Sequence, residues 1–234
     1  MSLASQREVP LGGGRVSTGV VRLGDTVRKP VTRNSKFVRR LLEHLADCGS
    51  RFTPGFLGID ERDRDVFEFI DGEVPADLGW FDEATLRQAA ELIRSFHDLT
   101  VELAGDAVDE ATGVEVVCHN DLSPCNFVFR GTDPVAIIDF DAAAPGTREH
   151  DLGYAAWLWL DLGSPGIRVS EQRRRLETFL DAYGTPDIES VLGAMLVRQK
   201  QLIEEAHRIG DVPMADWATG CHDWTRRNLD KLSG

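Results

Sequence analysis

Two short segments are the most informative of the chain: His119-Asn120-Asp121-Leu122-Ser123-Pro124-Cys125-Asn126 and Ile137-Ile138-Asp139-Phe140-Asp141, whose Asp139 follows Asn126 by thirteen residues. The two segments place a carboxylate, an amide and a second carboxylate at the ends of short strands. Phosphoryl transfer needs mainly a group that orients the attacking hydroxyl and oxygen ligands for the magnesium that bridges the nucleotide phosphates. The pattern therefore predicts that Asp121 orients a hydroxyl and that Asn126 and Asp139 hold Mg²⁺.

These segments resemble the catalytic and metal-binding motifs of the aminoglycoside phosphotransferase and choline kinase-like family, relatives of protein kinases. A third segment, His150-Asp151-Leu152-Gly153-Tyr154-Ala155-Ala156-Trp157, looks like the Asp-Leu-Ala helix start of that family. The resemblance implies a bilobal protein kinase-like fold with the nucleotide in the cleft between the lobes. It also implies that Asp121 accepts a hydrogen bond from the substrate hydroxyl, that His119 packs and orients the loop, and that Asp151 braces it.

The first part of the chain has the pattern of a sheet with one helix. A Gly24-Asp25 turn separates two short strands and predicts a hairpin, which Pro30 ends. Apolar residues at helical spacing predict a helix that stops at Gly49. The elements expected here are strands at 17–23, 26–29, 55–59 and 66–70 and a helix at 35–48.

The rest of the chain is predominantly helical in pattern. The turn-rich segment Asp71-Gly72-Glu73-Val74-Pro75 predicts a hinge at 71–76 between an N-terminal nucleotide-binding lobe, 1–70, and a C-terminal catalytic and substrate-binding lobe, 77–234. We therefore expect an α+β fold with a small antiparallel-sheet N-lobe and a mostly helical C-lobe. The elements expected beyond the hinge are helices at 82–100, 151–162, 171–184, 188–208 and 214–231 and short strands at 114–118, 127–130 and 135–139.

Composition and charge restrict the class of protein and of partner. The 234 residues are 42% hydrophobic and 28% charged, which excludes disordered and fibrous classes. The net charge of −13 is uneven, because residues 71–234 hold 14 Lys and Arg against 30 Asp and Glu. Such an acidic portion argues against nucleic-acid binding and would attract a cationic small molecule, although plain solubility also explains it. Acidic residues that could receive a cationic acceptor are Glu204, Glu205, Asp211, Asp216 and Asp223.

The cysteines and the longest apolar run bear on the compartment. Cys48, Cys118, Cys125 and Cys221 show no Cys-x-x-Cys spacing, and a zinc site with His119 is rejected for want of a second pair. Residues 1–10 have no apolar run of a signal sequence, and Tyr154–Leu160 is far too short to span a bilayer. We expect a cytoplasmic protein with no membrane association.

Three features of the first part predict nucleotide contacts. Gly12, Gly13 and Gly14 fit a loop whose backbone amides approach phosphates, although a hairpin turn is an equal alternative. Lys29 ends a strand in the manner of the kinase lysine that reaches the α and β phosphates. By position, Glu68-Phe69-Ile70 resembles the family's hinge segment, where backbone groups bind the purine edge, so Glu68 and Ile70 are expected to contact ATP or GTP.

The glutamate that kinase-like enzymes pair with this lysine is missing from its expected place. Glu43 lies roughly 160° around the helix from the apolar face, at about 100° per residue, and is therefore expected to be solvated. The family's glutamate would fall nearer Lys36 to Val38, where the chain has none. Either Lys29 binds phosphate without its usual ion pair, or nucleotide binding is weakened.

Two further aspartates have open roles. Asp141 would share a strand face with Asp139 and either assists metal binding, holds a water near it, or lies at the surface. Asp151 begins a helix, where it is expected to act as the N-cap as well as the brace implied by the resemblance.

The motifs together predict a small-molecule kinase that moves the γ-phosphate of ATP or GTP to a hydroxyl of an aminoglycoside-like or aminoalcohol acceptor. The alternative is a catalytically weak nucleotide-binding or immunity-type module, for which small relatives resembling trifolitoxin immunity proteins are a precedent. A protein kinase is disfavoured because eleven residues between Asp139 and Asp151 leave little room for a peptide-docking segment. The oligomeric state is left open.

Overall fold

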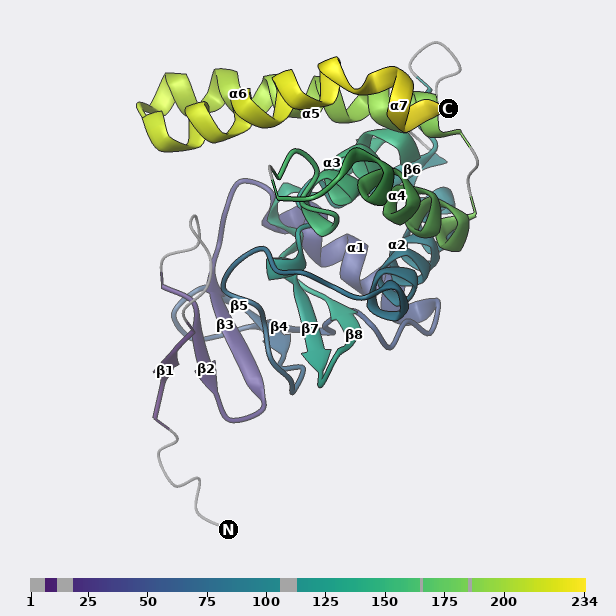
Figure 1. Ribbon diagram of the computed structural model, residues 1–234. Coiled ribbons are helices and arrows are strands. Elements are labelled where there is room, and N and C mark those ends of the chain that lie inside the picture. Colours follow the sequence, from purple (N-terminus) through teal and green to yellow (C-terminus); the bar gives the residue numbers. More distant parts are fainter. Residues whose placement is uncertain (1–6, 12–18, 106–112, 165, 185–186) are drawn as a thin grey trace.

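The computed structural model describes residues 7–11, 19–105, 113–164, 166–184 and 187–234 (Figure 1). The predicted phosphate-binding glycines Gly12, Gly13 and Gly14 lie outside these residues. Within the described chain, an antiparallel sheet forms the N-terminal part and helices dominate the C-terminal part, which is the predicted α+β, bilobal kinase-like class.

The N-terminal sheet is antiparallel throughout, in the strand order β1-β2-β3-β5-β4. Its hairpin forms at the predicted place, where Leu23 pairs with Thr26 across Gly24-Asp25 and the Thr26 hydroxyl donates to the Leu23 carbonyl at 2.7 Å. The strands are β1 (Val9–Pro10), β2 (Val21–Leu23), β3 (Thr26–Pro30), β4 (Phe56–Ile59) and β5 (Arg64–Glu68).

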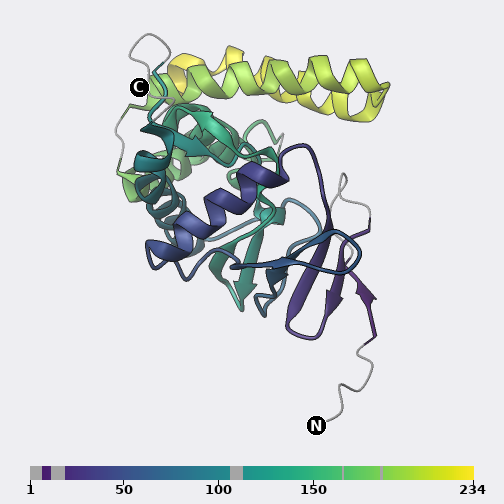
Figure 2. The ribbon, with the colours of Figure 1, turned by 180° about the vertical axis from the view of Figure 1, so that it is seen from behind.

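The helix α1 (Ser35–Asp47) connects the sheet to the helical part. Its buried stripe consists of Val38, Leu41, Leu42 and Leu45, and this stripe joins the same apolar core as α2 (Glu83–Ala104). Figure 2 shows α1 lying between the N-terminal sheet and the helices of the C-terminal part. Glu43 is exposed on the opposite side, as its helical phase predicts.

The C-terminal part consists of helices and two small two-stranded antiparallel sheets. β7 (Phe127–Arg130) pairs with β8 (Asp133–Ile137), and β6 (Val116–Cys118) pairs with β9 (Ala144–Gly146). The remaining helices are α3 (Arg148–Trp159), α4 (Val169–Tyr183), α5 (Ile188–Ile209), α6 (Val212–Arg227) and α7 (Leu229–Ser233). The predicted single last helix is therefore wrong: Asn228 leaves helical geometry and divides it into α6 and α7.

The segment that joins the two parts is fixed to β7. Glu73 and Phe129 exchange backbone hydrogen bonds of 2.9 and 2.7 Å. Gly72 makes this approach possible, because a Cβ at that position would lie 2.5 Å from the Phe129 carbonyl oxygen. Among the described residues, no helix is at once long and apolar enough to cross a membrane.

Candidate active site

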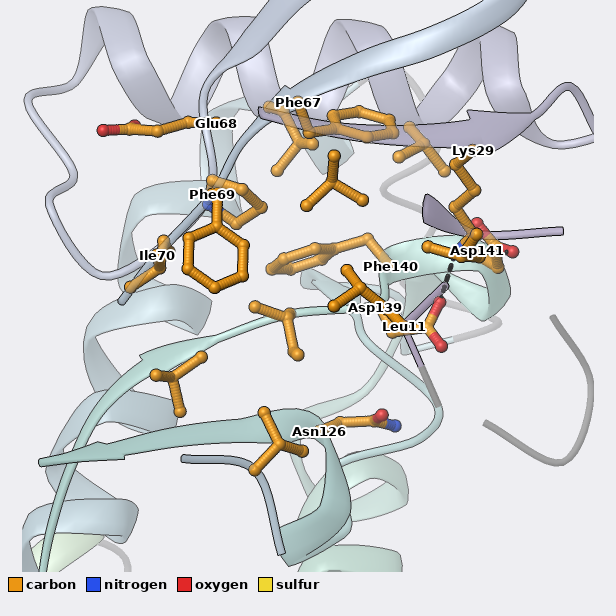
Figure 3. A pocket seen from close by; sticks show the side chains of 18 of the residues that line it. Leu11, Lys29, Phe67, Glu68, Phe69, Ile70, Asn126, Asp139, Phe140 and Asp141 are labelled. Atoms are coloured by element: carbon orange, nitrogen blue, oxygen red, sulfur yellow. Dashed lines mark hydrogen bonds and ion pairs between the residues drawn. The ribbon is translucent and has the colours of Figure 1, made fainter. Parts of the chain in front are cut away.

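A cavity of about 380 Å³ lies between the N-terminal sheet and the β7/β8 hairpin (Figure 3). Its volume lies in the range of small-molecule sites. One end is apolar, and Lys29, Asn126, Asp139 and Asp141 form a polar end. The apolar lining comes from both parts of the chain and includes Val27, Phe67, Phe69, Ile70, Val128 and Ile138.

Glu68 and Ile70, the residues predicted to contact the nucleotide base, both line the cavity. Figure 3 shows the Glu68 carboxylate pointing away from the middle of the cavity. The Glu68 side chain is therefore not placed to bind a ligand in the cavity, so a contact from this residue would have to come from its backbone.

Lys29 finds its partners on the far side of the cleft. Its ammonium lies 2.5 Å from Asp139 Oδ1 and 2.9 Å from Asp141 Oδ2. Burial lowers the pKa of Lys29, but the two carboxylates more than offset this, and the net pKa lies above the ordinary lysine value. The lysine thus has ion-pair partners in place of the absent helix glutamate.

The helix-to-sheet ion pair in this protein has the opposite polarity. Arg39 of α1 donates through Nε to Asp65 of β5 at 2.7 Å, and Asp65 is 2% exposed. Asp65 is the strand neighbour of Lys29 across the β3/β5 ladder. The cation on the helix and the acid on the strand therefore replace the pairing that the family resemblance implies.

The prediction that Asp139 and Asp141 share a strand face is wrong. β8 ends at Ile137, and Asp139 adopts a left-handed conformation with φ of 66° that starts a short 3-10 helix, Phe140–Ala142. This turn brings both carboxylates to Lys29 by a different route. Asn34, at the start of α1, secures the turn by donating to the carbonyls of Asp141 and Ala143 at 2.8 and 3.0 Å.

Asp121 and Asn126 are joined directly. Asn126 Nδ2 donates to Asp121 Oδ2 and to the Asp121 carbonyl, both at 2.8 Å. Because the amide nitrogen is engaged in this way, Oδ1 is the Asn126 atom left for a cation. That oxygen and the Asp139 carboxylate are ligands of the kind magnesium takes, so the residues present fit a magnesium ion.

Asp151 holds the backbone of the loop that carries Asp121. It is fully buried, and its carboxylate accepts from the backbone N–H of His119 at 2.6 Å and of Asn120 at 2.8 Å. Its expected N-cap role is wrong: Thr147 caps α3 by accepting from the His150 N–H.

His119 packs inside this loop rather than facing the cavity. It is buried, its Nε2 lies 3.0 Å from the Ile138 carbonyl oxygen, and its ring packs on Phe140. This geometry agrees with the orienting role that the resemblance implies. The neighbouring Cys118 thiol donates to the Thr147 carbonyl, and burial raises its pKa, which disfavours a reactive thiolate.

Comparison with known proteins assigns the family. Residues 103–193 match a family model described as the phosphotransferase enzyme family. The chain is also 32% identical over 193 residues to the trifolitoxin immunity protein of Rhizobium leguminosarum bv. trifolii, covering 74% of this chain and 72% of that relative. The chain belongs to the phosphotransferase enzyme family.

Solved structures of phosphotransferases share the fold. The GDP complex of aminoglycoside 2'-phosphotransferase-IIIa is similar with a TM-score of 0.63 and 15% identity, over 96% of this chain and 93% of that chain. Choline kinase LicA from Streptococcus pneumoniae is similar with a TM-score of 0.57 and 15% identity, over 91% of this chain and 89% of that chain. At these identities the likeness concerns the fold alone.

The family match includes Asp121, Asn126, Asp139 and Asp151 but not Lys29. In this phosphotransferase-family protein the structure brings Lys29 to Asp139, one of the matched residues, and to Asp141. The acidic residues proposed for a cationic acceptor lie elsewhere, on α5, α6 and the turn between them, and do not line the cavity. Among the described residues, no three His, Cys, Asp or Glu side chains are grouped to hold a metal. The candidate magnesium ligands are of another kind, because one of them, Asn126, is an amide.

Some residues that shape the site were missed by sequence reasoning. His97, within the helix predicted at 82–100, is fully buried, with Nε2 3.1 Å from Asp151 Oδ2 and Nδ1 2.8 Å from the Tyr183 hydroxyl. Tyr154 contacts Asp121, and Arg198 contacts the Asn120 carbonyl. For Tyr154 the sequence offered one signal, its spacing of one helical turn from Asp151. For Arg198 it offered none, because Arg198 is distant in sequence from the loop that it contacts.

Proposed function

We propose that this phosphotransferase-family protein transfers the γ-phosphate of ATP or GTP to a hydroxyl of a small, cationic molecule. The observation that carries the proposal is that Asn126, which lines the polar end of the cavity with Asp139 and Lys29, donates a hydrogen bond to Asp121 just behind it. A group for the hydroxyl, oxygen ligands for a cation and an ammonium for phosphate then lie together, which is the set that phosphoryl transfer uses.

Each residue has a distinct role in the proposal. Asp121 accepts a hydrogen bond from the attacking hydroxyl and orients it, while Asn126 and Asp139, with Asp141 beside them, hold Mg²⁺. When bound, Mg²⁺ neutralises charge on the phosphates. Lys29 exchanges its contact with a carboxylate for one with phosphate, and Gly12, Gly13 and Gly14 contribute backbone amides.

The nucleotide base would occupy the apolar end, with the backbone of Glu68 and Ile70 at its edge. The lobes would meet at residues 71–76, between an N-lobe of 1–70 and a C-lobe of 77–234. We infer that the reaction takes place in the cytoplasm, where nucleoside triphosphates are supplied.

The acceptor class follows from charge and kinship. Residues 71–234 carry an excess of acids, and the field of such a surface concentrates cations. The names of the structural neighbours describe an aminoglycoside phosphotransferase and a choline kinase, whose acceptors are cationic. These facts support an amino sugar or aminoalcohol acceptor.

A panel of hydroxylated amino sugars, aminoalcohols and neutral sugars, assayed by release of ADP or GDP, tests the proposal. We expect turnover with a cationic acceptor and, in Asp121→Asn, a kcat lower by about 10² to 10⁴. Asp230→Asn, at an exposed position on α7, is the matched control and should keep wild-type kcat. Turnover that is equal in Asp121→Asn and wild type would show that the mechanism is wrong.

A catalytically weak nucleotide-binding or immunity-type module is the second candidate. The observation that favours it is the similarity to a protein named for trifolitoxin immunity, together with the absence of a helix glutamate for Lys29. Thermal stabilisation by Mg-ATP without turnover of any acceptor in the panel would support this candidate over the first.

A further inference from the structure

Both oxygens of the Asp121 carboxylate accept a hydrogen bond. The Tyr154 hydroxyl donates to Asp121 Oδ1 at 3.0 Å, and Asn126 Nδ2 donates to Oδ2 at 2.8 Å. An ionised carboxylate has about four lone-pair sites, so two remain for a substrate hydroxyl. The two donors therefore restrict the orientation of the carboxylate without filling it.

Tyr154 lies on α3, and other α3 side chains hydrogen-bond to the main chain of the loop that carries Asp121. Asp151, one turn earlier on α3, accepts from the backbone N–H groups of His119 and Asn120. Trp159 Nε1, further along α3, donates to the Leu122 carbonyl at 3.1 Å. These two residues fix the main chain on either side of Asp121, whereas Tyr154 is the α3 residue that reaches its side chain.

Tyr154 is itself held in place by its ring. Trp157 packs edge-on against it at a centroid distance of 6.1 Å, and the Arg198 guanidinium lies 4.8 Å from the ring centroid. Arg198 also donates from Nη2 to the Asn120 carbonyl at 2.8 Å. A single α5 side chain thus supports both the tyrosine ring and the loop that the tyrosine contacts.

The phenol is a secure donor at neutral pH. Burial raises the pKa of Tyr154, and the adjacent Asp121 charge and hydrogen bond raise it further. The hydroxyl therefore keeps its proton at neutral pH.

We propose that Tyr154, supported by Arg198, is a positioning residue that holds the Asp121 carboxylate in the orientation that receives the acceptor hydroxyl. The inference rests on the proposed function and deepens it at the same site. Transfer depends on the placement of the hydroxyl, and small misplacements of an orienting group are costly. Tyr154 acts through Asp121, so its removal should matter only while Asp121 is an aspartate.

A double-mutant cycle tests this dependence. Tyr154→Phe removes the hydroxyl and keeps the ring for Trp157 and Arg198, and we expect kcat to fall about tenfold with an unchanged nucleotide KM. On an Asp121→Asn background the same change should lower kcat less than twofold, because the carboxylate that Tyr154 positions is already absent. A tenfold loss on both backgrounds would overturn the proposal, since it would show a general structural effect.

Tyr183→Phe is the matched control, because Tyr183 is the other tyrosine of the chain and its hydroxyl contacts His97 and Arg148 instead of Asp121. Its effect on kcat should be the same on both backgrounds. The unfolding temperature of Tyr154→Phe should stay closer to wild type than that of Tyr183→Phe. The reason is that the Tyr183 hydroxyl contacts the fully buried His97, which in turn contacts Asp151.

A second measurement does not depend on activity. With ¹³Cζ-labelled tyrosine the protein gives two signals, and Tyr154→Phe identifies that of Tyr154. Asp121→Asn should shift the Tyr154 signal, while the Tyr183 signal stays in place. An unmoved Tyr154 signal would show that the contact is absent and would refute the inference. A shifted signal without turnover of any acceptor would instead refute the proposed function.

Discussion

At the scale of single residues, the brace on the loop depends on one fully buried carboxylate. Asp151 accepts two backbone N–H groups and lies 3.1 Å from His97 Nε2. Burial by itself raises the pKa of Asp151, but His97, His119 and these hydrogen bonds outweigh it, so the net pKa is below the ordinary value of 3.8. The ionised form is therefore the one that the fold stabilises.

We expect Asp151→Asn to lower the free energy of unfolding by about 3 kcal/mol at pH 7, because the amide presents a donor to an N–H group. A carboxyl group with a depressed pKa in the folded state contributes stability above its unfolded pKa and loses it as pH falls through the folded pKa. The difference between wild type and Asp151→Asn should therefore be constant above about pH 5 and shrink below about pH 4. Urea unfolding across this range measures it; a difference that grows on acidification would contradict the assignment.

At the scale of elements, the crossing of α3 and α5 sets the position of Tyr154 relative to Arg198. Gly153 lies at the contact: a Cβ there would be 2.5 Å from the Met195 backbone nitrogen and 2.9 Å from the Ala194 carbonyl carbon. Those are backbone atoms, which cannot rotate away as a side chain can. The glycine is therefore what allows α5 to approach the helix that braces the loop.

Gly153→Ala should destabilise the protein by about 1 to 3 kcal/mol, the usual cost of overpacking a close contact. Gly193→Ala on α5 is the matched control, because no atom lies within 4 Å of the Cβ it would add, and alanine is about 1 kcal/mol more favourable than glycine inside a helix. Thermal unfolding of the two variants should move in opposite directions. Equal shifts would mean that the close contact is not what limits this position.

At the scale of the whole molecule, the cavity draws its lining from both the N-terminal sheet and the helical part. The chain passes between these parts at Gly72 and Glu73, where Glu73 pairs with Phe129 of β7. A ligand in the cavity contacts both sides, so its binding free energy adds to the stability of the assembled molecule. Lys29 is the cationic side chain of the sheet that faces the acids of the helical part.

Mg-ATP or Mg-GTP at a hundred times its Kd should raise the free energy of unfolding by about 2.7 kcal/mol, and thus the unfolding temperature. Lys29→Met should reduce the shift at the same nucleotide concentration, because the phosphates lose their ammonium. Lys200→Met, at an exposed position on α5, should keep the wild-type shift. Differential scanning calorimetry measures all three, and equal shifts in wild type and Lys29→Met would exclude a phosphate role for the lysine.

Much of the fold and of the candidate site could be predicted because it depends on residues that are close together in the sequence. The stripe of α1, the Gly24-Asp25 hairpin and the motif around Asp121 depend on residues a few positions apart, and the solvated phase of Glu43 followed from helical geometry alone. The turn at Asp139 escaped prediction because its left-handed conformation is held by Asn34, over a hundred residues earlier. The partners of Lys29 escaped it for the same reason.

Local sequence specifies the fold class and the residue types of the candidate site: short-range periodicity specifies the helices, and the spacing of Asp121, Asn126 and Asp139 gives an oxygen-rich motif of the kind that phosphoryl transfer uses. Three contacts depend on the tertiary fold: the pairing of Lys29 with Asp139 and Asp141, the ion pair of Arg39 on α1 with the β5 acid, and the hydrogen bond from Tyr154 to Asp121. Each of them joins residues that are far apart along the chain. Ion pairs and hydrogen bonds need atoms within about 3 Å of one another, and for residues far apart in sequence packing alone sets that separation.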